Sequence, residues 1–386
     1  MDRTGVVVIG AGPIGIEVAA GLKASGLSYE HLEAGDLGAT MGWWAPDTRF
    51  FSSPERIRIC DIPLVIPGEE KATGEQYRDY LRGVVEQLGL RVRTHERVLD
   101  IEARDGGGFV VVSRGPAGGS RIACDSVVLA TGNMDAPRLI GVPGEDLPHV
   151  SHYFRGPHHY YGRKVLIVGG KNSAAEAALR LYRAGVEVSI SYRGRRFDPD
   201  RVKYWIRPEL EWLIEKGKIG FLPCTRPVEI EPGQVRLERT SLTQYEECPP
   251  GAEMHDGQQE RGEGVRNGLA DVETHADSEL ARSGGRRVEV PADFVLLLTG
   301  YVQDQTFFER LELDLIGEER RPMYDHDTME TSVPGVYVAG TACGGSQTRA
   351  RVFIENSHVH AERIVAALTG DRLKAPEPSY GAMEES

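Results

Sequence analysis

A short apolar strand, a glycine-rich turn and a helix follow one another twice in this chain, and each set ends in a second strand. The first set has its strand at Val6–Ile9, its turn at 10–15 and a second strand that ends near Glu33. The second set has its strands at Lys164–Val168 and Val186–Tyr192. Such a unit binds a dinucleotide at its turn. The expected fold class is α/β, with two dinucleotide-binding, Rossmann-like domains.

The chain has 386 residues, which is enough for two domains. We expect the first domain to be discontinuous, formed by residues 1–150 and 293–386, and the second to span 151–292. Paired glycines within 105–119 predict hairpins of a small antiparallel insert. A polar, acidic and glycine-rich segment at about 244–287 is interpreted as a surface insertion of the second domain.

Charge and hydropathy exclude several classes of protein. The formal net charge of -13 disfavours contact with nucleic acid or an anionic membrane. No run approaches the ~20 apolar residues of a membrane helix. The strand near the N-terminus leads directly into the first glycine turn, so no signal peptide is expected. We expect a cytoplasmic homo-oligomer whose partner is a small molecule or a small redox protein.

The first glycine turn has every feature of a dinucleotide site. Gly10 permits the tight turn, Gly12 lets the backbone reach a pyrophosphate, and Gly15 lets helix and strand pack closely. The N–H groups at the start of the helix then face the phosphates. Glu33 stands where an acid hydrogen-bonds a ribose hydroxyl. The residues expected to contact this cofactor are Gly10, Gly12, Pro13, Ile14, Gly15, Glu33 and Ala34.

The second glycine turn differs at two places. Ala174 replaces the third glycine and still allows close packing. The second strand ends in arginines rather than an acid, which suits the 2′-phosphate of NADPH through a charge-assisted contact. A solvated basic turn is the alternative. The residues expected to contact this nucleotide are Gly169, Gly170, Asn172, Ser173, Ala174, Arg193 and Arg195.

Three further segments favour FAD as the cofactor of the first domain. Two strands end in the similar sequences Ala-Thr131-Gly132 and Leu-Thr299-Gly300, as do the strands that join the two domains of two-dinucleotide flavoproteins. The third segment, Val336–Thr341, is similar to their C-terminal flavin segment. Such proteins usually have Gly-Asp there, whereas this chain has Gly340-Thr341. Thr131, Gly132, Gly300, Gly340 and Thr341 are therefore further expected cofactor contacts.

Six segments along the chain, among them residues 50–55, 169–174 and 203–208, match the pattern of one known family. Through these segments the sequence resembles the YpdA family of bacillithiol disulfide reductases over nearly its whole length. The segment at 244–287 is the part that matches least. The resemblance implies a thioredoxin-reductase-like flavoprotein that uses FAD and NADPH. It is carried by Phe50-Phe-Ser-Ser-Pro-Glu55, His152-Tyr-Phe154, Gly169-Gly-Lys-Asn-Ser-Ala174, Lys203-Tyr-Trp-Ile-Arg-Pro208, Thr299-Gly-Tyr301 and Phe353-Ile-Glu-Asn356.

One departure from the family concerns the reaction itself. The family has a cysteine within the first glycine turn, in a Gly-Pro-Cys-Gly arrangement, and this chain has Ile14 in its place. Isoleucine forms no mixed disulfide. Cys343 follows the C-terminal flavin segment, where a helix N-terminus would lower a thiol pKa. It is either a relocated catalytic thiol or a small apolar side chain that fills space.

The sequence therefore does not decide which molecule accepts the electrons from the flavin. The resemblance implies a low-molecular-weight disulfide. A carrier protein such as a ferredoxin needs no thiol, and a flavin monooxygenase or a non-catalytic sensor of the nucleotide pool are further alternatives. No Cys-x-x-Cys pair is present among the five cysteines.

Two other groups of residues are weighed against simple structural roles. Four histidines at positions 149, 152, 158 and 159 lack acids or cysteines at ligand spacing, so no metal is expected. His152 is a candidate for assisting NADPH binding or proton transfer. Aromatic residues at positions 43, 44, 50 and 51 form either a wall beside the flavin or ordinary loop packing.

Overall fold

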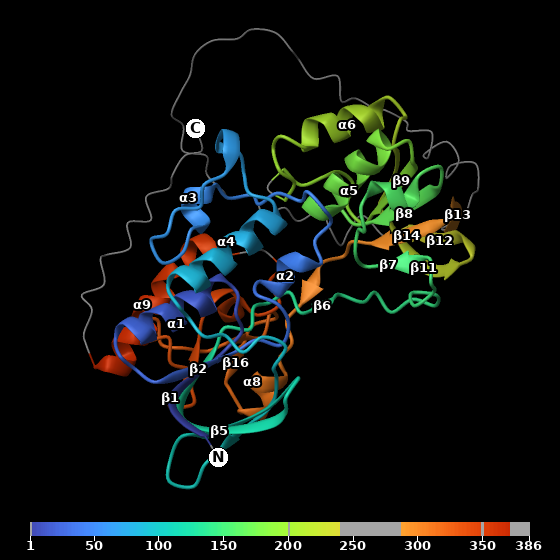
Figure 1. Cartoon of the computed structure of the whole chain (residues 1–386). Helices are drawn as coiled ribbons and strands as arrows, with labels where there is room; N and C mark the ends of the chain where they lie inside the picture. Colours follow the sequence, from blue (N-terminus) through green and yellow to red (C-terminus); the bar gives the residue numbers. More distant parts are fainter. Residues whose placement is uncertain (1, 200, 240–286, 349–350, 371–386) are drawn as a thin grey trace, which may run out of the picture. The chain divides into compact units, whose positions relative to one another are not determined.

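The computed structural model describes residues 2–199, 201–239, 287–348 and 351–370 (Figure 1). The chain divides into two compact units. Unit 1 comprises Met1–Pro137 and Tyr301–Ser386, and unit 2 comprises Arg138–Gly300. The expected insertion at 244–287 lies outside the described residues, apart from Arg287. Within the described residues, no helix has the length and apolar character needed to cross a membrane.

Unit 1 is built on a six-stranded sheet in the order β2-β1-β5-β4-β3, with β18 also paired to β5. The strands β2, β1, β5 and β18 are parallel, and β3, β4 and β5 are antiparallel. The predicted antiparallel insert is thus continuous with the parallel sheet, because the long strand β5 belongs to both. The strands are β1 Asp2–Ile9, β2 Tyr29–Leu32, β3 Arg97–Ala103, β4 Phe109–Gly115, β5 Gly118–Leu129 and β18 Val336–Val338.

Two short ribbons complete the strands of unit 1. One pairs β6 Ala136–Pro137 with β15 Tyr301–Val302, and the other pairs β16 Leu315–Ile316 with β17 Arg321–Pro322. The helices are α1 Pro13–Ala24, α2 Ala39–Gly42, α3 Pro54–Ile57, α4 Gly74–Gln87, α8 Thr306–Arg310 and α9 His358–Thr369. Short 3₁₀ turns are η1 Pro67–Glu69, η4 Gly340–Gly344 and η5 Ile354–Asn356.

The segment 353–368 does not form one continuous helix. Residues Ile354–Asn356 form a 3₁₀ turn, and α9 begins only at His358. Side chains satisfy the backbone locally at this point: the Asn356 amide oxygen accepts from the Phe353 N–H, and the Ser357 hydroxyl donates to the Phe353 carbonyl. Such local hydrogen bonds compete with a continuous helix.

Unit 2 has a parallel five-stranded sheet in the order β10-β9-β8-β14-β7 and an antiparallel three-stranded sheet in the order β11-β12-β13. The parallel strands are β7 Val150–Ser151, β8 Lys164–Val168, β9 Glu187–Tyr192, β10 Gly220–Pro223 and β14 Phe294–Leu297. The antiparallel strands are β11 Thr225–Glu231, β12 Gly233–Arg239 and β13 Arg287–Ala292. The helical segments are η2 Pro157–Tyr160, α5 Asn172–Arg183 and α6 Arg207–Glu215.

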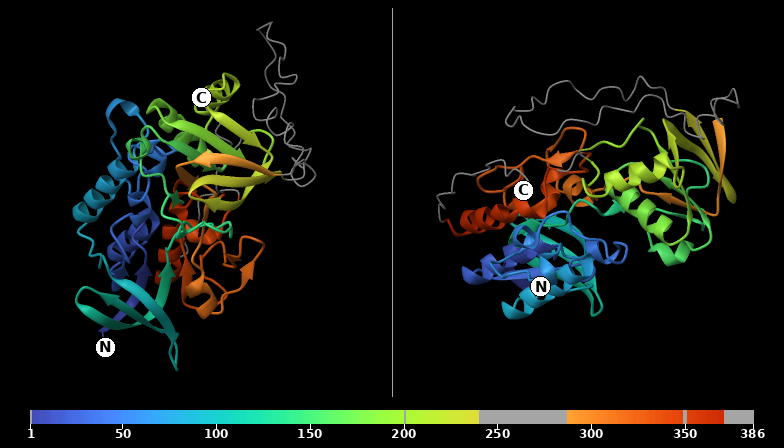
Figure 2. Two further views of the ribbon diagram at one scale, coloured as in Figure 1. Left: turned by 90° about the vertical axis from the view of Figure 1, so that its right-hand side faces the viewer. Right: turned by 90° about the horizontal axis from the view of Figure 1, so that it is seen from above.

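Alternate residues of β8 show that unit 2 has three layers. Leu166 and Val168 pack with apolar residues of the antiparallel sheet. Figure 2 shows this sheet beside the parallel sheet of unit 2. Val165 and Ile167 pack with the buried face of α5. A strand buried on both faces reads as a continuous apolar run, which is what β8 shows. The expected α/β class with two Rossmann-like units is confirmed.

Unit 2 is longer at both ends than the range 151–292 expected from the sequence. Strand β7 pairs with β14, where Val150 lies opposite Val295. Strand β14 also pairs with β8, where Phe294 lies opposite Val165. Backbone pairing therefore places these segments in unit 2, and unit 1 resumes at Tyr301.

Candidate functional site

The first glycine turn joins β1 to α1 in unit 1. Gly10 has φ +103°, and a Cβ there would collide with the Ala130 carbonyl. A Cβ added at Gly15 would collide with the carbonyl oxygen of Gly10. At Gly12, in contrast, a Cβ would meet no atom within 4 Å. Two glycines are thus needed for the turn itself, and the third leaves open space at the start of the helix.

The helix α1 starts at Pro13, because proline is suited to the first helical position. Its N-cap residue, Gly12, has no side chain that could accept from the first N–H groups. The first turn of α1, all of whose residues the structure describes, contains no acidic residue. The N–H groups and the positive end of the helix dipole are therefore available to an anion.

Glu33 follows β2 and lies at this turn, as the sequence predicts. One carboxylate oxygen accepts a hydrogen bond from the Ala11 N–H at 2.7 Å, and the other accepts from the Gly35 N–H at 2.8 Å. Each oxygen retains a second lone pair, so the carboxylate can still accept from ribose hydroxyls. The neighbouring Ala34 is exposed.

The segments that end β5 and β18 lie side by side, because these strands pair in parallel. A Cβ added at Gly132 would lie 3.9 Å from the Thr341 hydroxyl oxygen, and one added at Gly340 would lie 3.2 Å from Ile14 Cβ. The structure therefore brings the first glycine turn, the Thr131-Gly132 segment and the Gly340-Thr341 segment together within unit 1.

Buried Gln303 holds two of these segments and has no sequence signal of its own. Its amide nitrogen donates to the Gly132 carbonyl at 2.8 Å and to the Ala342 carbonyl at 3.0 Å. Its amide oxygen is buried without a partner among the described residues. His31, whose ring contacts the Gly10 carbonyl at 2.9 Å, is a second residue that the sequence reasoning missed.

The expectation of a lowered thiol pKa at Cys343 is wrong. The residue is 1% exposed, and burial raises the pKa of its thiol far above the ordinary value. The segment η4 is a five-residue 3₁₀ turn, too short to offset this desolvation by its dipole. His360 Nδ1 lies 3.8 Å from the sulfur, but it accepts the Gly340 N–H at 3.1 Å. It is therefore not free to take the thiol proton.

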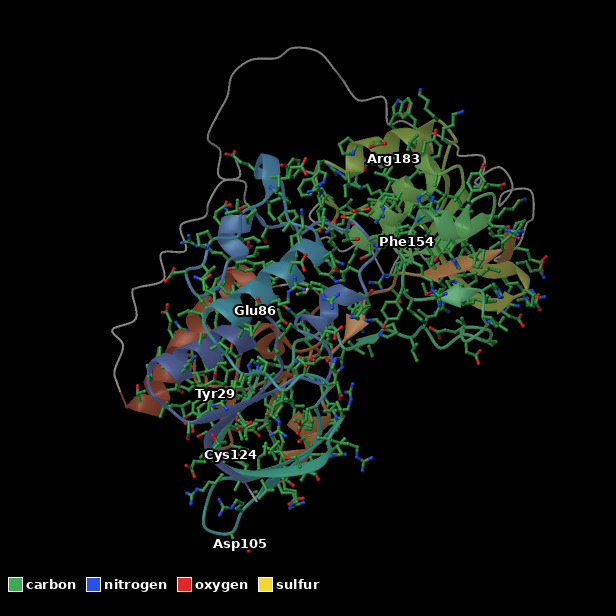
Figure 3. All side chains as sticks on the ribbon, in the orientation of Figure 1. Tyr29, Glu86, Asp105, Cys124, Phe154 and Arg183 are labelled. Atoms are coloured by element: carbon green, nitrogen blue, oxygen red, sulfur yellow. The ribbon has the colours of Figure 1, made fainter. Side chains whose placement is uncertain are left out.

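Two other cysteines of unit 1 are also poor nucleophiles. Cys124, labelled in Figure 3, lies in β5. Burial raises the pKa of Cys124 and the pKa of Cys60, each to about 12. The carboxylate of Glu17, which accepts from the Cys60 N–H at 3.1 Å, raises the Cys60 value further. At neutral pH these thiols stay protonated, and the thiol form is unreactive toward disulfides.

The second glycine turn joins β8 to α5 in unit 2. A Cβ added at Gly170 would collide with the ring of Tyr192, so the absence of a side chain lets this ring lie over the turn. Asn172 starts α5, and its side-chain oxygen accepts from the Lys203 N–H at 2.6 Å. Among the residues that the structure describes, the first turn of α5 resembles that of α1, because it has neither an acidic residue nor a side-chain cap.

Positive charge gathers around this second turn. Burial lowers the pKa of Lys171, and the cationic groups of Arg201, Arg193 and Arg138 lower it further. Arg193 and Arg195 follow β9 on the exposed loop between Tyr192 and Phe197, whose stacked rings lie 5.8 Å apart. A region in which cations repel one another is suited to a phosphate group. The residues of both units thus fit dinucleotides.

The four histidines near the start of unit 2 do not come together. His152 Nε2 lies 3.4 Å from a Glu145 carboxylate oxygen, whereas His159 packs against Tyr160 and Phe294. Across the described parts of the chain, no group of three potential metal ligands is found. Phe154, labelled in Figure 3, stacks on Tyr160 at 5.9 Å.

The aromatic residues after β2 are divided between two settings. Trp44 and Phe50 pack in the core beside α4, with Phe50 4.8 Å from the ring of Tyr77. Trp43 instead contacts Tyr301, at a centroid distance of 4.7 Å. Ordinary packing therefore accounts for Trp44 and Phe50.

Two α/β units, each with parallel strands, a glycine turn and an uncapped helix N-terminus, are typical of the two-dinucleotide class of flavoproteins. The family model described as pyridine nucleotide-disulphide oxidoreductase matches residues 7–246 and 265–340. The bacilliredoxin reductase Bdr of Bacillus subtilis (strain 168) is 31% identical over 370 residues, which cover 95% of this chain and 98% of that protein. The chain therefore belongs to the pyridine nucleotide-disulphide oxidoreductase family, among the relatives of Bdr (YpdA).

Solved structures agree with this assignment. The bacillithiol disulfide reductase Bdr (YpdA) from Bacillus cereus has a TM-score of 0.79 and 29% identity, covering 96% of this chain and 99% of that one. The thioredoxin reductase of T. acidophilum shares the fold alone, with a TM-score of 0.64 and 17% identity over 96% and 99% of the two chains. The protein is thus an FAD-dependent oxidoreductase that uses NADPH, and the YpdA resemblance is confirmed.

Proposed function

We propose that unit 1 binds FAD, that unit 2 binds NADPH, and that the protein reduces a low-molecular-weight disulfide without a thiol of its own. The observation that carries the first part is the pair of uncapped helix N-termini, α1 and α5, each behind a glycine turn. Backbone N–H groups and the helix dipole at such a place bind a pyrophosphate.

In unit 1 the chain's own residues would hold FAD from three sides. The turn and the start of α1 would contact the pyrophosphate, Glu33 and Ala34 would contact the ribose, and the paired segments after β5 and β18 would contact the flavin half. Thr341 offers a neutral hydroxyl where the family usually has an acid. The residues proposed for this site are Gly10, Gly12, Pro13, Ile14, Gly15, Glu33, Ala34, Thr131, Gly132, Gly340 and Thr341.

In unit 2 the second turn would hold NADPH. The start of α5 faces the pyrophosphate, and the arginines after β9 supply forked, charge-assisted hydrogen bonds to a 2′-phosphate. The repulsion that lowers the pKa of Lys171 is relieved when such a dianion binds. The residues proposed for this site are Gly169, Gly170, Asn172, Ser173, Ala174, Arg193 and Arg195. Gly300, which the sequence grouped with the FAD contacts, belongs to unit 2 and is therefore proposed for this site instead.

When bound, FAD supplies a redox-active ring that takes hydride from the nicotinamide and gives electrons to the acceptor. The balanced reaction is one disulfide with NADPH and one proton, giving two thiols and NADP⁺. Ile14 is 4% exposed and packs on Gly340, so its place offers an apolar, water-excluding wall rather than a thiol. The disulfide class is supported by the relatives, whose names specify bacillithiol disulfide and bacilliredoxin reduction.

A small electron-carrier protein is the second candidate acceptor. Ile14 and the high pKa of Cys343 favour it, because transfer to a carrier needs no mixed disulfide. This candidate and the disulfide differ only in the second half-reaction.

The two half-reactions are tested separately. Anaerobic rapid mixing of the FAD-loaded protein with NADPH should bleach the flavin absorbance, and the absence of bleaching with both NADPH and NADH would refute the proposal. Steady-state turnover is then compared for bacillithiol disulfide, oxidised glutathione and a ferredoxin. Turnover of a disulfide by a variant that lacks Cys60, Cys124 and Cys343 would establish reduction without these thiols. Turnover with ferredoxin alone would favour the carrier.

A further inference from the structure

His31 is a buried, uncharged histidine on the strand that precedes Glu33. It is 1% exposed, and its Nε2 lies 2.9 Å from the carbonyl oxygen of Gly10. A carbonyl only accepts hydrogen bonds, so Nε2 must carry the proton and donate it. Burial lowers the pKa of His31 to about 4, which keeps the ring neutral near pH 7.

The other ring nitrogen of His31 lowers the stability of the folded protein, because it is buried without a hydrogen bond from any residue that the structure describes. With the proton on Nε2, Nδ1 is a bare acceptor, and it is buried without a partner among the described residues. Its partner across the pairing of β1 with β2 is the fully buried, apolar Val8. An apolar side chain of similar size would fill the space without burying a ring nitrogen, but it would leave the Gly10 carbonyl without this donor. The hydrogen bond to Gly10 is therefore the feature that distinguishes histidine here.

The carbonyl of Gly10 and the N–H of Ala11 belong to the same peptide group. His31 donates to the carbonyl, and the Glu33 carboxylate accepts from the N–H at 2.7 Å. Residues two apart in an extended segment project to the same side, which lets one strand reach both ends of this peptide. The Gly10–Ala11 peptide is thus held at both its polar ends.

This peptide sets the position of the start of α1. The Gly10 carbonyl oxygen lies so close to Gly15 that a Cβ there would collide with it. A rotation of the peptide would move this oxygen relative to the first turn of the helix. The N–H groups of that turn are the ones that the proposed function directs at a pyrophosphate.

We propose that His31 is a positioning residue for the dinucleotide of unit 1. It acts by fixing the orientation of the Gly10–Ala11 peptide through its hydrogen bond to the Gly10 carbonyl. The inference rests on the proposed function, because it takes FAD as the ligand of this turn. His31 and Glu33 have different roles in this arrangement, since Glu33 contacts the peptide and also faces the proposed ribose, whereas His31 holds the peptide alone.

Three substitutions separate a hydrogen-bonding role from a space-filling one. His31→Gln places an amide nitrogen near the position of Nε2 and keeps the donor. His31→Met has similar length and no donor. His31→Asn is polar, but its amide reaches only the position of Nδ1, so the Gly10 carbonyl loses its partner.

The readouts are the FAD dissociation constant of the apoprotein, from quenching of flavin fluorescence, and the urea midpoint of the apoprotein. We expect His31→Gln to bind FAD within about threefold of the wild type, and His31→Met to bind about tenfold more weakly with no loss of apoprotein stability. Should His31→Met fail to fold, FAD release on heating the FAD-loaded proteins gives the second comparison, with His31→Asn releasing FAD at a lower temperature than His31→Gln.

Equal FAD affinity of His31→Met and the wild type would overturn the inference and leave the proposed function intact. So would equal release temperatures for His31→Asn and His31→Gln. A wild-type apoprotein that takes up no FAD would overturn the proposed function, and with it the role of His31. Weakened binding that is restored by Gln alone supports the inference.

Discussion

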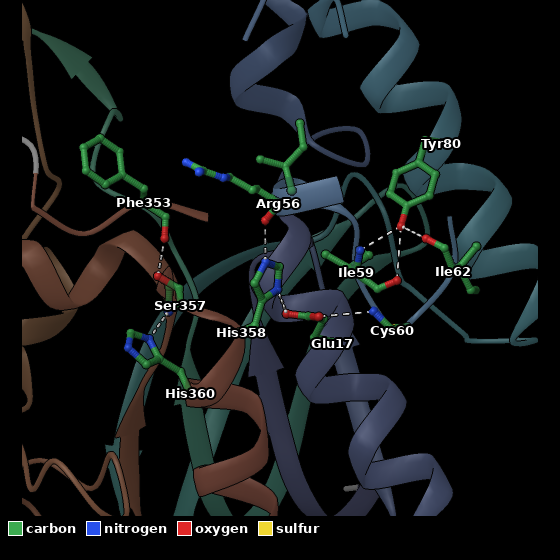
Figure 4. A network of polar contacts seen from close by, with 12 residues as sticks. Glu17, Arg56, Ile59, Cys60, Ile62, Tyr80, Phe353, Ser357, His358 and His360 are labelled. Carbon is green, nitrogen blue, oxygen red and sulfur yellow. Dashed lines mark hydrogen bonds and ion pairs between the residues drawn. The ribbon is translucent and has the colours of Figure 1, made fainter. Parts of the chain in front are cut away.

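The imidazole of His358, the first residue of α9, hydrogen-bonds to the carboxylate of Glu17 in α1 through Nδ1 at 2.9 Å (Figure 4). Its Nε2 lies 3.0 Å from the Arg56 carbonyl. Both partners are acceptors, so both ring nitrogens must carry protons, and the ring is an imidazolium when both bonds are made. This cation links the helices α1, α3 and α9, although 341 residues separate His358 from Glu17.

The first prediction concerns the pH dependence of stability. Burial acts to lower the pKa of His358, but Glu17, the Arg56 carbonyl and Glu355 together raise it above 6.5. A raised pKa in the folded state gives stability that is fully present below the unfolded pKa and is lost as the pH rises through the folded pKa. His358→Gln should therefore cost about 1–2 kcal/mol at pH 6, and the cost should shrink by pH 9. Urea unfolding of both proteins at the two pH values measures this, and a cost independent of pH would contradict it.

A second prediction separates two glycines of the first turn. Gly12→Ala adds a methyl group in open space, so the apoprotein should unfold at the wild-type urea concentration. FAD binding should nevertheless weaken by about tenfold or more, because the methyl group enters the space proposed for the pyrophosphate. Unchanged FAD affinity of Gly12→Ala in a fluorescence titration would place the pyrophosphate elsewhere.

Gly15→Ala is the matched comparison for that variant. Its methyl group collides with the Gly10 carbonyl in the protein itself. The free energy of unfolding of the apoprotein should therefore fall by about 2 kcal/mol or more. Equal stability of Gly12→Ala and Gly15→Ala would show that the turn can relax around the added methyl group.

Local patterns in the sequence were enough to predict both glycine turns and the position of Glu33. The reason is that strand, turn, helix and acid follow one another within about 25 residues, with a spacing imposed by the fold. The second turn, with Gly170, and the helix α5 behind it were predicted from the same local pattern of strand, turn and helix. The end of unit 2 was predicted less well, because strand pairing rather than local composition assigns β7 and β14 to its sheet.

Contacts between distant segments account for what the sequence did not predict. The bond from His31 to Gly10 depends on which side of β2 faces the turn, and the partners of Gln303 lie at Gly132 and Ala342. Burial likewise decided the state of Cys343, which the sequence left open between a reactive thiol and a space-filling one. Depth in a core depends on the whole fold, so a motif cannot specify it.

A third prediction concerns the choice between NADPH and NADH. Arg195→Ala removes one cation from the loop after β9, where the 2′-phosphate is proposed to bind. The KM for NADPH should rise about 10–100-fold, the loss expected for a hydrogen bond to a charged group, and the KM for NADH should change little. Arg183→Ala is the control, because Arg183 pairs with Glu209 elsewhere on unit 2 (Figure 3). An equal rise for both nucleotides would argue against a 2′-phosphate contact.

The last prediction tests whether Cys343 takes part in the reaction. Its thiol is buried, its pKa is raised, and the Nδ1 lone pair of His360 is already engaged by the Gly340 N–H. Cys343→Ala should therefore keep kcat and KM for a disulfide acceptor within about twofold and lower the free energy of unfolding by about 1 kcal/mol. In the native protein at pH 8, iodoacetamide should leave Cys343 unmodified and should alkylate it only after unfolding. Fast flavin reduction combined with lost disulfide turnover in Cys343→Ala, but not in a Cys60→Ala control, would instead assign this buried sulfur to the electron path.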